Sequence, residues 1–242
     1  MRRIRGRKIG AIFQDPLTSL NPLYTIGRQL VETIQAHTPA TAKQAKAQAI
    51  ALLEDTGIPA AAQRIDHYPH QFSGGMRQRV VIALALAAQP KLIVADEPTT
   101  ALDVSIQAQI ITLLKDICTK RGASVMLITH DMGVIAETCD RVAVMYAGRI
   151  AEIGPVHSVI NQPAHPYTAG LMAAIPDMTL DREHLHQIDG AMPRLNAIAA
   201  GCAFNPRCPQ RFEPCVLQRP DLQPAGATRA ACWLSAPTSP TT

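Results

Sequence analysis

The chain has 242 residues, of which 47% are hydrophobic and 17% are charged, and its formal net charge is +4 at pH 7. This length allows one large domain with a sizeable core, or such a domain with an appendage. Five positive charges cluster at residues 2–8, and a short solvated end explains them more simply than binding to nucleic acid or anionic lipid. We therefore expect no nucleic-acid partner.

The amino-terminal residues lack the pattern of a secretory signal, because the apolar stretch at residues 9–13 is short and ends at Gln14 and Asp15. No apolar segment reaches the length of a membrane-spanning helix. We therefore expect a cytoplasmic protein that reaches a membrane only through a partner.

The first part of the chain is predicted to be mainly helical. A short strand is expected at residues 8–13, followed by a stretch rich in turn-forming residues that ends at Pro22. Helices are expected at residues 25–35 and 41–55, the second ending near Gly57, and a loop at residues 58–71.

Residues 72–79, with the sequence Phe-Ser-Gly-Gly-Met-Arg-Gln-Arg, indicate a phosphate-binding surface. Two adjacent glycines let the backbone approach an anion closely, and they precede a predicted helix over residues 76–88. The first N–H groups of a helix lack partners, and the helix dipole favours negative charge there. In isolation, an ordinary N-cap is the simpler explanation of Ser73.

Residues 91–95 predict a buried parallel strand that ends in Asp96, Glu97 and Pro98. Ligands of α/β sheets bind at the carboxyl ends of the strands. The two carboxylates are therefore either solvated loop residues or functional groups. In the functional interpretation, Asp96 holds a hydrated Mg²⁺ and Glu97 orients or deprotonates the water that attacks a γ-phosphate.

The next elements continue an α/β pattern. A helix over residues 104–121, ended by Gly122, is followed by a buried strand at 124–129 that delivers His130 at its carboxyl end. A short helix is expected at 134–139 and a hairpin of 141–146 with 149–154, turning at Ala147-Gly148. Residues 155–175 are predicted to be helical with a break at His165-Pro166-Tyr167, and loops dominate from Pro176 onward.

Residues 73–79 and 92–103, including Thr99-Thr100-Ala101-Leu102-Asp103, together resemble the signature motif, Walker B motif and D-loop of ABC ATPases. The resemblance implies ATP and Mg²⁺ as cofactors and a role for each matching residue. The implied catalytic residues are Glu97, His130 (the H-loop) and Gln14 (the Q-loop). The implied Mg²⁺ ligands are Asp96 and Gln14, and the implied nucleotide contacts are Ser73, Gly74, Gly75, Gln78 and Asp103.

The branch of the family is indicated by residues 13–22 and by the tail. Both resemble the peptide and nickel importer ATPases, the tail through Asn161-Gln162-Pro163, His165-Pro166-Tyr167, Gly201-Cys202 and residues 205–209. The implied fold is α/β, a partial P-loop NTPase (RecA-like) sheet with an ABC helical subdomain and a loop-rich, cysteine-containing extension. The expected parts are 1–22 (strand and Q-loop), 23–90 (helical subdomain with the signature), 91–155 (catalytic core) and 156–242 (extension).

Four of the six cysteines lie in the tail: Cys202, Cys208, Cys215 and Cys232. A reducing compartment argues against disulfides, and the lack of a C-x-x-C pair weakens a zinc-ribbon interpretation. Four thiolates can hold an iron–sulfur cluster, and the resemblance points to a [4Fe-4S] cluster in some relatives. The alternative is a set of free thiols packed beside Trp233 and Phe204. We expect Cys118 and Cys139 to be inert core residues.

No stretch fits the phosphate-cradling pattern G-x-x-x-x-G-K-[ST], the Walker A motif. We therefore expect an amino-terminally truncated ATPase that is inactive alone, although its Ser73 and Gly75 could complete a site in trans. The sheet would have an uncovered apolar seam, because residues 92–95 and 125–128 both need neighbours on each side. The chain alone is expected to be poorly stable or to aggregate.

The leading functional hypothesis is an ATPase subunit that couples ATP hydrolysis to the import of oligopeptides or dipeptides. The expected partners are a second ABC ATPase subunit, as a homo- or heterodimer, integral-membrane permease subunits and, indirectly, an extracytoplasmic peptide-binding protein. This places the chain on the inner face of the cell membrane. The alternatives are a non-catalytic remnant that supplies its signature in trans or binds a partner, and a soluble ABC ATPase not linked to transport.

Overall fold

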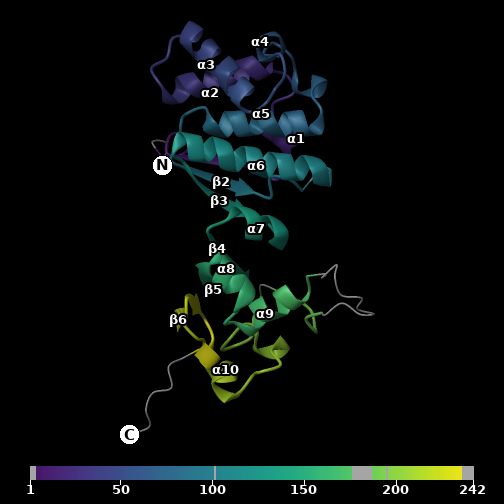
Figure 1. Cartoon of the computed structure of the whole chain (residues 1–242), viewed down its shortest axis with the longest axis vertical. Coiled ribbons are helices and arrows are strands. Elements are labelled where there is room, and N and C mark those ends of the chain that lie inside the picture. The colour runs from purple at the N-terminus through teal and green to yellow at the C-terminus, as the bar shows by residue number, and fades with distance from the viewer. Residues whose placement is uncertain (1–3, 101, 176–186, 195, 236–242) are drawn as a thin grey trace. The chain divides into compact units, whose positions relative to one another are not determined.

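The computed structural model describes residues 4–100, 102–175, 187–194 and 196–235 (Figure 1). The chain divides into two compact units, residues 1–131 and 132–242. The predicted loops after Pro176 lie partly outside the described residues. No helix in the described part of the chain is both long enough and apolar enough to cross a membrane.

The first unit contains a parallel sheet of three strands in the order β1-β2-β3. The strands are β1 (Ile9–Ile12), β2 (Leu92–Asp96) and β3 (Ser124–Ile128), all close to their predicted positions. In the register, Ala95 of β2 lies beside Ile12 of β1 and Leu127 of β3. The segments that follow all three strands therefore leave the same edge of the sheet.

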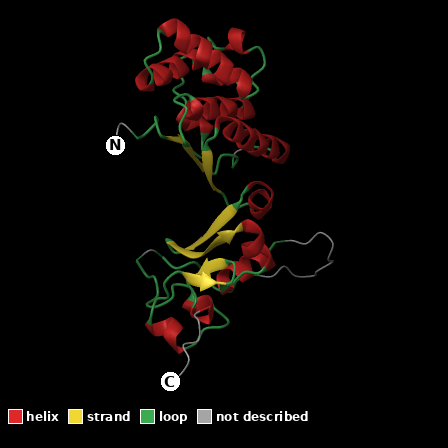
Figure 2. Cartoon of the chain, turned by 60° about the vertical axis from the view of Figure 1, so that its left-hand side comes forward, coloured by secondary structure: helices red, strands yellow, loops and turns green. Residues whose placement is uncertain are grey.

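The helices of the first unit pack above this sheet. Figures 1 and 2 show α2, α3 and α4 gathered at the end of the unit away from the strands, with α5 and α6 between them and the sheet. Segments predicted as turns or loops contain three short helices, α1, α4 and η1, and in two of them a proline, Pro16 or Pro69, begins the helical turn. The elements are α1 (Pro16–Ser19), α2 (Ile26–His37), α3 (Ala42–Asp55), α4 (Ala61–Arg64), the 3₁₀ helix η1 (Pro69–Gln71), α5 (Gly74–Leu86) and α6 (Val104–Arg121).

Local sequence explains where the longer helices begin. Thr25 caps α2 by accepting from the Arg28 N–H, and Thr41 caps α3 in a reciprocal capping box with Gln44. Helix α6 ends at Gly122, whose φ of +64° is the left-handed conformation predicted for a glycine at a helix end. These signals lie in the sequence itself, and the predicted boundaries were correspondingly close.

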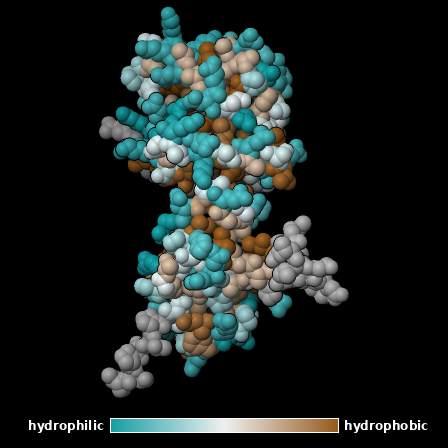
Figure 3. Space-filling model, in the orientation of Figure 1, coloured by the Kyte–Doolittle hydropathy of each residue, from teal (hydrophilic) through white to brown (hydrophobic). Residues whose placement is uncertain are grey.

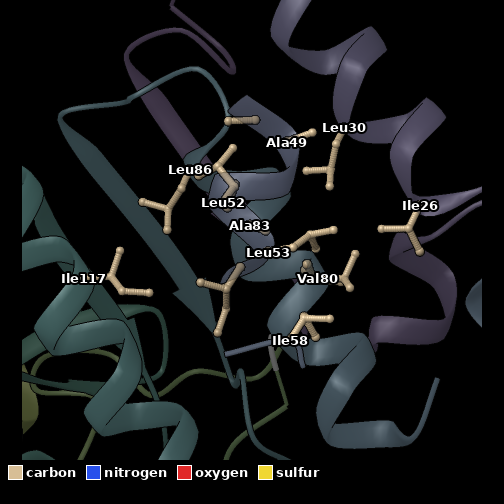
Figure 4. Packing of buried hydrophobic residues seen from close by; sticks show 14 of the residues in the cluster. Ile26, Leu30, Ala49, Leu52, Leu53, Ile58, Val80, Ala83, Leu86 and Ile117 are labelled. Carbon is tan, nitrogen blue, oxygen red and sulfur yellow. The ribbon is translucent and has the colours of Figure 1, made fainter. Parts of the chain in front are cut away.

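The core of this unit centres on α5, whose buried residues pack against α2, α3 and β1 (Figure 4). Val80 and Leu86 of α5 meet Leu30 and Leu53 from the neighbouring helices in this cluster. Strand β1 approaches α5 so closely that a Cβ on Gly10 would lie 2.5 Å from the Ala85 carbonyl oxygen. A glycine is required at that contact.

The prediction that the strand at residues 124–129 is buried was wrong. Val125, Met126 and Ile128 are 36%, 49% and 45% exposed. Among the described strands β3 pairs only with β2, so its outer edge and the face that carries Met126 and Ile128 lack cover, whereas Leu127 packs against the core. Figure 3 shows apolar residues among polar ones on one face of this unit. The expectation of an uncovered apolar seam agrees with this arrangement.

The second unit contains an antiparallel sheet in the order β4-β5-β7-β6. The predicted hairpin is confirmed: its strands pair in antiparallel fashion, and Ala147 and Gly148 turn with φ of +48° and +77°. The elements are α7 (Met132–Thr138), β4 (Arg141–Tyr146), β5 (Arg149–Pro155), α8 (Val156–Asn161), α9 (Pro166–Ala173), η2 (Asn205–Arg207), α10 (Glu213–Leu217), β6 (Gln223–Ala225), β7 (Thr228–Ala230) and η3 (Trp233–Ser235).

A buried carboxylate fastens this unit together. Glu152 of β5 accepts from the backbone N–H groups of Ala164 and His165 at 2.9 and 3.0 Å, and from the Thr228 hydroxyl of β7 at 3.0 Å. Since buried charges are tolerated when they are fully hydrogen-bonded, these donors make the site stable. His165 in turn accepts from the Tyr167 N–H and caps α9, which explains the predicted break between α8 and α9.

The uncovered strand predicts self-association of the isolated chain. A substitution of Met126→Lys places a charge on the exposed face of β3 and should shift the purified chain toward the monomer, because exposed apolar edges template pairing between molecules. Size-exclusion chromatography with light scattering measures this shift.

The matched control is Val104→Lys, which changes an exposed valine at the start of α6, outside the sheet. It should associate as the unmodified chain does. An unmodified chain that is monomeric and unfolds cooperatively on heating would contradict the prediction.

Candidate active site

Glu97 leaves the carboxyl end of β2 in an unusual backbone conformation. Its φ is +44°, in the left-handed region that residues with side chains rarely adopt. Its N–H donates to the carbonyl of Ile128, the last residue of β3, at 2.9 Å. The turn after β2 is thus tied to the end of the neighbouring strand. Such strained positions commonly occur at functional sites.

Three side chains converge on the Glu97 carboxylate. The Gln14 Nε2 donates to Oε2 at 2.8 Å, the Thr100 hydroxyl donates to the same oxygen at 2.7 Å, and the His130 Nδ1 lies 3.1 Å from Oε1. The structure therefore brings together the three predicted catalytic residues. Thr100 was not predicted as a site residue, although its place three residues after the glutamate is a signal that could have identified it.

The hydrogen bonds also set the charge of this carboxylate. The Thr100 hydroxyl, and next the His130 ring, hold the pKa of Glu97 below its ordinary value, while partial burial acts in the opposite direction. Glu97 is therefore ionised at neutral pH. Because His130 is exposed, solvent screens its attraction for the carboxylate, and hydrogen-bond geometry contributes more than charge.

The predicted Mg²⁺ ligands lie at the same edge of the sheet. Asp96 is the exposed last residue of β2, directly before Glu97. Gln14 uses its Nε2 for Glu97, which leaves its Oε1 available as an oxygen ligand. Carboxylate and amide oxygens are the donors that Mg²⁺ prefers, so the residues present fit this ion.

The signature residues form a second group, beside the start of α6. Ser73 is the N-cap of α5 and accepts from the Met76 N–H at 3.4 Å. A Cβ on Gly75 would lie 2.9 Å from Ile106 of α6, and one on Gly74 would lie 3.6 Å from Leu102. The two glycines thus allow the signature to pack against the predicted D-loop, in which Ala101 lies outside the described residues.

Two predicted nucleotide contacts lie in different environments. Asp103 is exposed and occupies the N-cap position of α6, beside the signature group. Gln78 is only 1% exposed, and neither atom of its amide has a hydrogen-bond partner among the described residues. A nucleotide on the surface formed by Ser73 and Gly75 would not reach Gln78, because α5 turns this side chain into the core. A role of Gln78 as a nucleotide contact therefore stays a prediction, at a position that is buried in this structure.

The four tail cysteines converge on one narrow cavity in the second unit, with a volume of about 10 Å³, and His165 and Phe204 also line it. All four are free thiols. Burial raises the pKa values of Cys202, Cys208 and Cys232, whereas backbone N–H groups that donate to their sulfurs act in the opposite direction. These N–H groups belong to Phe204 and Asn205 for Cys202, to Gln210 for Cys208 and to Leu234 for Cys232.

The cavity of the four tail cysteines was compared with what a metal ion and a cluster need. No three His, Cys, Asp or Glu side chains of the described residues are grouped so that they could hold one metal ion. In a [4Fe-4S] cluster each of four cysteines binds a different iron, which requires wider spacing and the same ligand count. A cavity of about 10 Å³ has room for about one water molecule, so a cluster would have to spread its walls.

The other two cysteines lie elsewhere. Cys118 is buried in the core of the first unit, and burial raises its pKa. Because the thiolate is the reactive form, a raised pKa agrees with an inert residue. Cys139 is half-buried and follows α7 in the second unit.

Comparisons with known proteins agree with this site. The family described as "ABC transporter" matches residues 1–100, and "Oligopeptide/dipeptide transporter, C-terminal region" matches residues 151–215. The dipeptide transport ATP-binding protein DppD of Bacillus subtilis is 49% identical over 235 residues, which are 97% of this chain and 70% of DppD. The oligopeptide transport ATP-binding protein AppD of the same organism is 47% identical over 220 residues, 91% of this chain and 67% of AppD.

Solved structures show the same class. The dimeric ATP-binding cassette MJ0796 bound to ADP and Pi is 31% identical, with a TM-score of 0.56 over 64% of this chain and 65% of that chain. CbiO1 of Clostridium perfringens, part of an ABC transporter complex, is 28% identical, with a TM-score of 0.57 over 64% of this chain and 60% of that chain. The fold is the α/β ABC cassette fold, a P-loop NTPase fold.

The chain belongs to the ATP-binding subunits of oligopeptide and dipeptide ABC importers. It spans about 70% of the length of the relative DppD.

The Thr100 hydroxyl generates a prediction about pH. A substitution of Thr100→Val should raise the pKa of Glu97 toward its ordinary value, because it removes the largest cause of the lowering. The chemical shift of the Glu97 carboxyl carbon, followed by NMR against pH, measures this. Since the folded pKa is depressed, the network stabilises the fold above the ordinary glutamate pKa of 4.5, and its contribution is lost as the pH falls through the lowered value.

The matched control is Thr100→Ser, which keeps the hydroxyl and should keep the lowered pKa. Equal Glu97 titration curves in the valine and serine variants would show that the hydroxyl does not control this carboxylate.

Proposed function

We propose that Gln14, Asp96, Glu97 and His130 carry out the hydrolysis chemistry of this ATPase subunit. The observation that carries the proposal is the Glu97 carboxylate, which is held at the carboxyl end of β2 by Gln14, Thr100 and His130. A general base has to be ionised and held in a fixed orientation before a water molecule can be activated, and this arrangement supplies both.

Each residue has a defined part in this proposal. Asp96 and the Oε1 of Gln14 would hold Mg²⁺, which when bound neutralises phosphate charge. Glu97 orients the attacking water and accepts its proton. His130 binds Glu97 through Nδ1, so its Nε2 remains for a γ-phosphate oxygen.

The nucleotide is proposed to lie between two subunits. The pattern G-x-x-x-x-G-K-[ST] does not occur in the 242 residues. We infer that Ser73 and Gly75 close over a nucleotide held by the P-loop of a second ATPase subunit, and that Asp103 lies at the same seam. The solved MJ0796 cassette bound to ADP and Pi is itself dimeric. Because the 242 residues contain no such phosphate-cradling pattern, we propose that they bind ATP weakly by themselves.

The permease is proposed to dock beside Gln14. Phe13, Leu17 and Leu23 are 61%, 60% and 78% exposed and surround the Q-loop glutamine in the sequence. An apolar surface of this kind suits a helix of a membrane partner. Movement of this segment would displace Gln14 and thereby change its hydrogen bond to Glu97. This coupling would link transport to hydrolysis. The chain would thus lie on the inner face of the membrane, and a peptide-binding protein would act through the permease.

Peptides are proposed as the substrate, because the relatives are named for dipeptide and oligopeptide transport and the matched tail family carries the same description. The tail match makes a soluble ABC ATPase unrelated to transport the weaker alternative. A remnant that binds a partner without turnover is the stronger rival, and the ATPase experiment below separates it from an active subunit. The division into parts at residues 22, 90 and 155 is retained as a proposal.

We further propose that Cys202, Cys208, Cys215 and Cys232 hold a [4Fe-4S] cluster. Their convergence on one cavity, together with the backbone N–H groups directed at three of the sulfurs, supports this. Such donors stabilise thiolates, the form in which cysteine binds iron. Three of the thiols are predominantly neutral at pH 7 without iron, because their pKa values are raised, and would release protons on binding.

The seam proposal predicts hydrolysis in trans. Adding this chain to a complete ATPase subunit of the same importer should stimulate ATP hydrolysis. The substitution Ser73→Arg should abolish most of the stimulation, by about tenfold or more, because a bulky cation replaces the cap that faces the phosphates. A coupled phosphate-release assay measures the rate.

The control is Ser124→Arg at the amino end of β3, the end opposite His130, which should leave stimulation intact. No stimulation by the unmodified chain would favour the non-catalytic remnant. Stimulation that survives Ser73→Arg would exclude the signature from the nucleotide site.

The cluster proposal predicts iron binding. The chain treated anaerobically with ferrous iron and sulfide should bind about four iron atoms and gain visible absorbance. Cys208→Ser should lower both, because one ligand is lost, whereas Cys139→Ser should change neither. Full iron loading in a Cys208→Ser, Cys215→Ser double variant would contradict the ligand set.

A further inference from the structure

The side chain of Gln107 reaches back from the first turn of α6 to the predicted D-loop, residues 99–103. Its Nε2 donates to the carbonyl oxygen of Thr99 at 3.1 Å and to that of Leu102 at 2.9 Å. Because both partners are carbonyl oxygens, only the nitrogen end of the amide can occupy this position. The side chain is half-buried. One residue therefore joins two points of the same loop to a helix.

The start of α6 leaves this task to Gln107. Asp103 occupies the N-cap position, but its side chain makes no capping hydrogen bond. Its backbone carbonyl accepts from the N–H groups of Ile106 and Gln107, each at 2.9 Å, so the helix begins there without a side-chain cap. Asp103 itself is exposed. The loop is thus fastened by a side chain from within the helix, and the carboxylate beside it stays available at the surface.

The loop that Gln107 holds contacts both parts of the candidate site. On one side, the Thr100 hydroxyl donates to the Glu97 carboxylate at 2.7 Å. On the other side, Leu102 lies against the signature, where a Cβ on Gly74 would be 3.6 Å from its side chain. The two carbonyls that accept from Gln107 therefore lie in the segment that connects the catalytic acid with the signature.

Apolar packing contributes little to the position of part of this loop, because Thr100 and Asp103 are both exposed. Two hydrogen bonds from one planar amide instead fix the loop relative to α6. Helix α6 in turn packs against α5, the helix that begins with the signature. The Gln107 amide thus determines where the D-loop lies beside the signature.

We propose that Gln107 is a positioning residue, which holds the D-loop so that Asp103 and the signature residues Ser73 and Gly75 face the subunit seam together. This inference rests on the proposed seam between two ATPase subunits. Gln107 contacts neither the nucleotide nor the reacting atoms in this proposal, and it acts through the two loop carbonyls. Without its amide the loop would occupy other positions, and the seam would close less often in the geometry that supports hydrolysis.

The substitution Gln107→Met tests this role, because methionine has a similar length and helix propensity but no N–H group. The matched control is Gln109→Met on the same helix. Gln109 is exposed, points to a different side of α6 and accepts from Arg79 of α5 at 3.4 Å. Thermal unfolding of both variants checks that they are folded.

The full chain and each variant are added in increasing amounts to a complete ATPase subunit of the same importer, and phosphate release is followed at saturating ATP. A variant that is merely less stable reaches the stimulated rate of the unmodified chain once enough of it is present. Gln107→Met should instead reach a plateau about fivefold lower, because the loop is misplaced in every complex. Gln109→Met should match the unmodified chain. Equal plateaus for all three chains would overturn the role of Gln107.

A second measurement needs no partner subunit. In ¹⁵N-labelled chains, the heteronuclear NOE values of the Thr100 and Leu102 amides report motion on the ps–ns timescale. They should fall in Gln107→Met and stay unchanged in Gln109→Met. Equal values in the three chains would overturn the positioning role. Failure of the unmodified chain to stimulate hydrolysis would instead overturn the seam proposal, so the two failures are distinguishable.

Discussion

The arrangement of the first unit depends on one carboxylate that collects donors from distant parts of the sequence. Gln14 and His130 reach Glu97 across 83 and 33 residues, and the parallel sheet is what brings them together. Because β2 lies between β1 and β3, the segments that follow all three strands meet at one edge. The left-handed backbone of Glu97 and its bond to Ile128 then fix the acid at that meeting point. Disturbing the sheet order would separate the site residues even if each were retained.

The second unit is organised around a different carboxylate with a structural role. Glu152 is fully buried, and its donors come from the start of α9 and from β7. It also holds the backbone of His165, a residue that lines the cysteine cavity. The two carboxylates differ in their environment: Glu97 is partly exposed at the edge of a sheet, whereas Glu152 is buried and hydrogen-bonded on both oxygens.

Local signals accounted for much of what could be predicted from the sequence. Capping threonines, the glycine after α6 and the Ala147-Gly148 turn act through neighbouring atoms, so their elements were placed within a few residues. The meeting of Gln14, Glu97 and His130 followed from strand ends and from family resemblance. Other features depend on tertiary contacts that sequence patterns do not encode. The exposure of β3 reflects which strands pair, and the burial of Gln78 reflects how α5 is rotated in the core.

The bond between Glu152 and Thr228 has a consequence for how the second unit is made. Residue 152 leaves the ribosome long before residue 228, and until then β5 also lacks β7, the strand with which it pairs. Until β7 emerges, the Glu152 carboxylate lacks one of its three donors, and its hydration is more favourable than its burial. This half of the protein should therefore complete its folding late in synthesis, and nascent chains stalled before residue 228 should remain open to proteases.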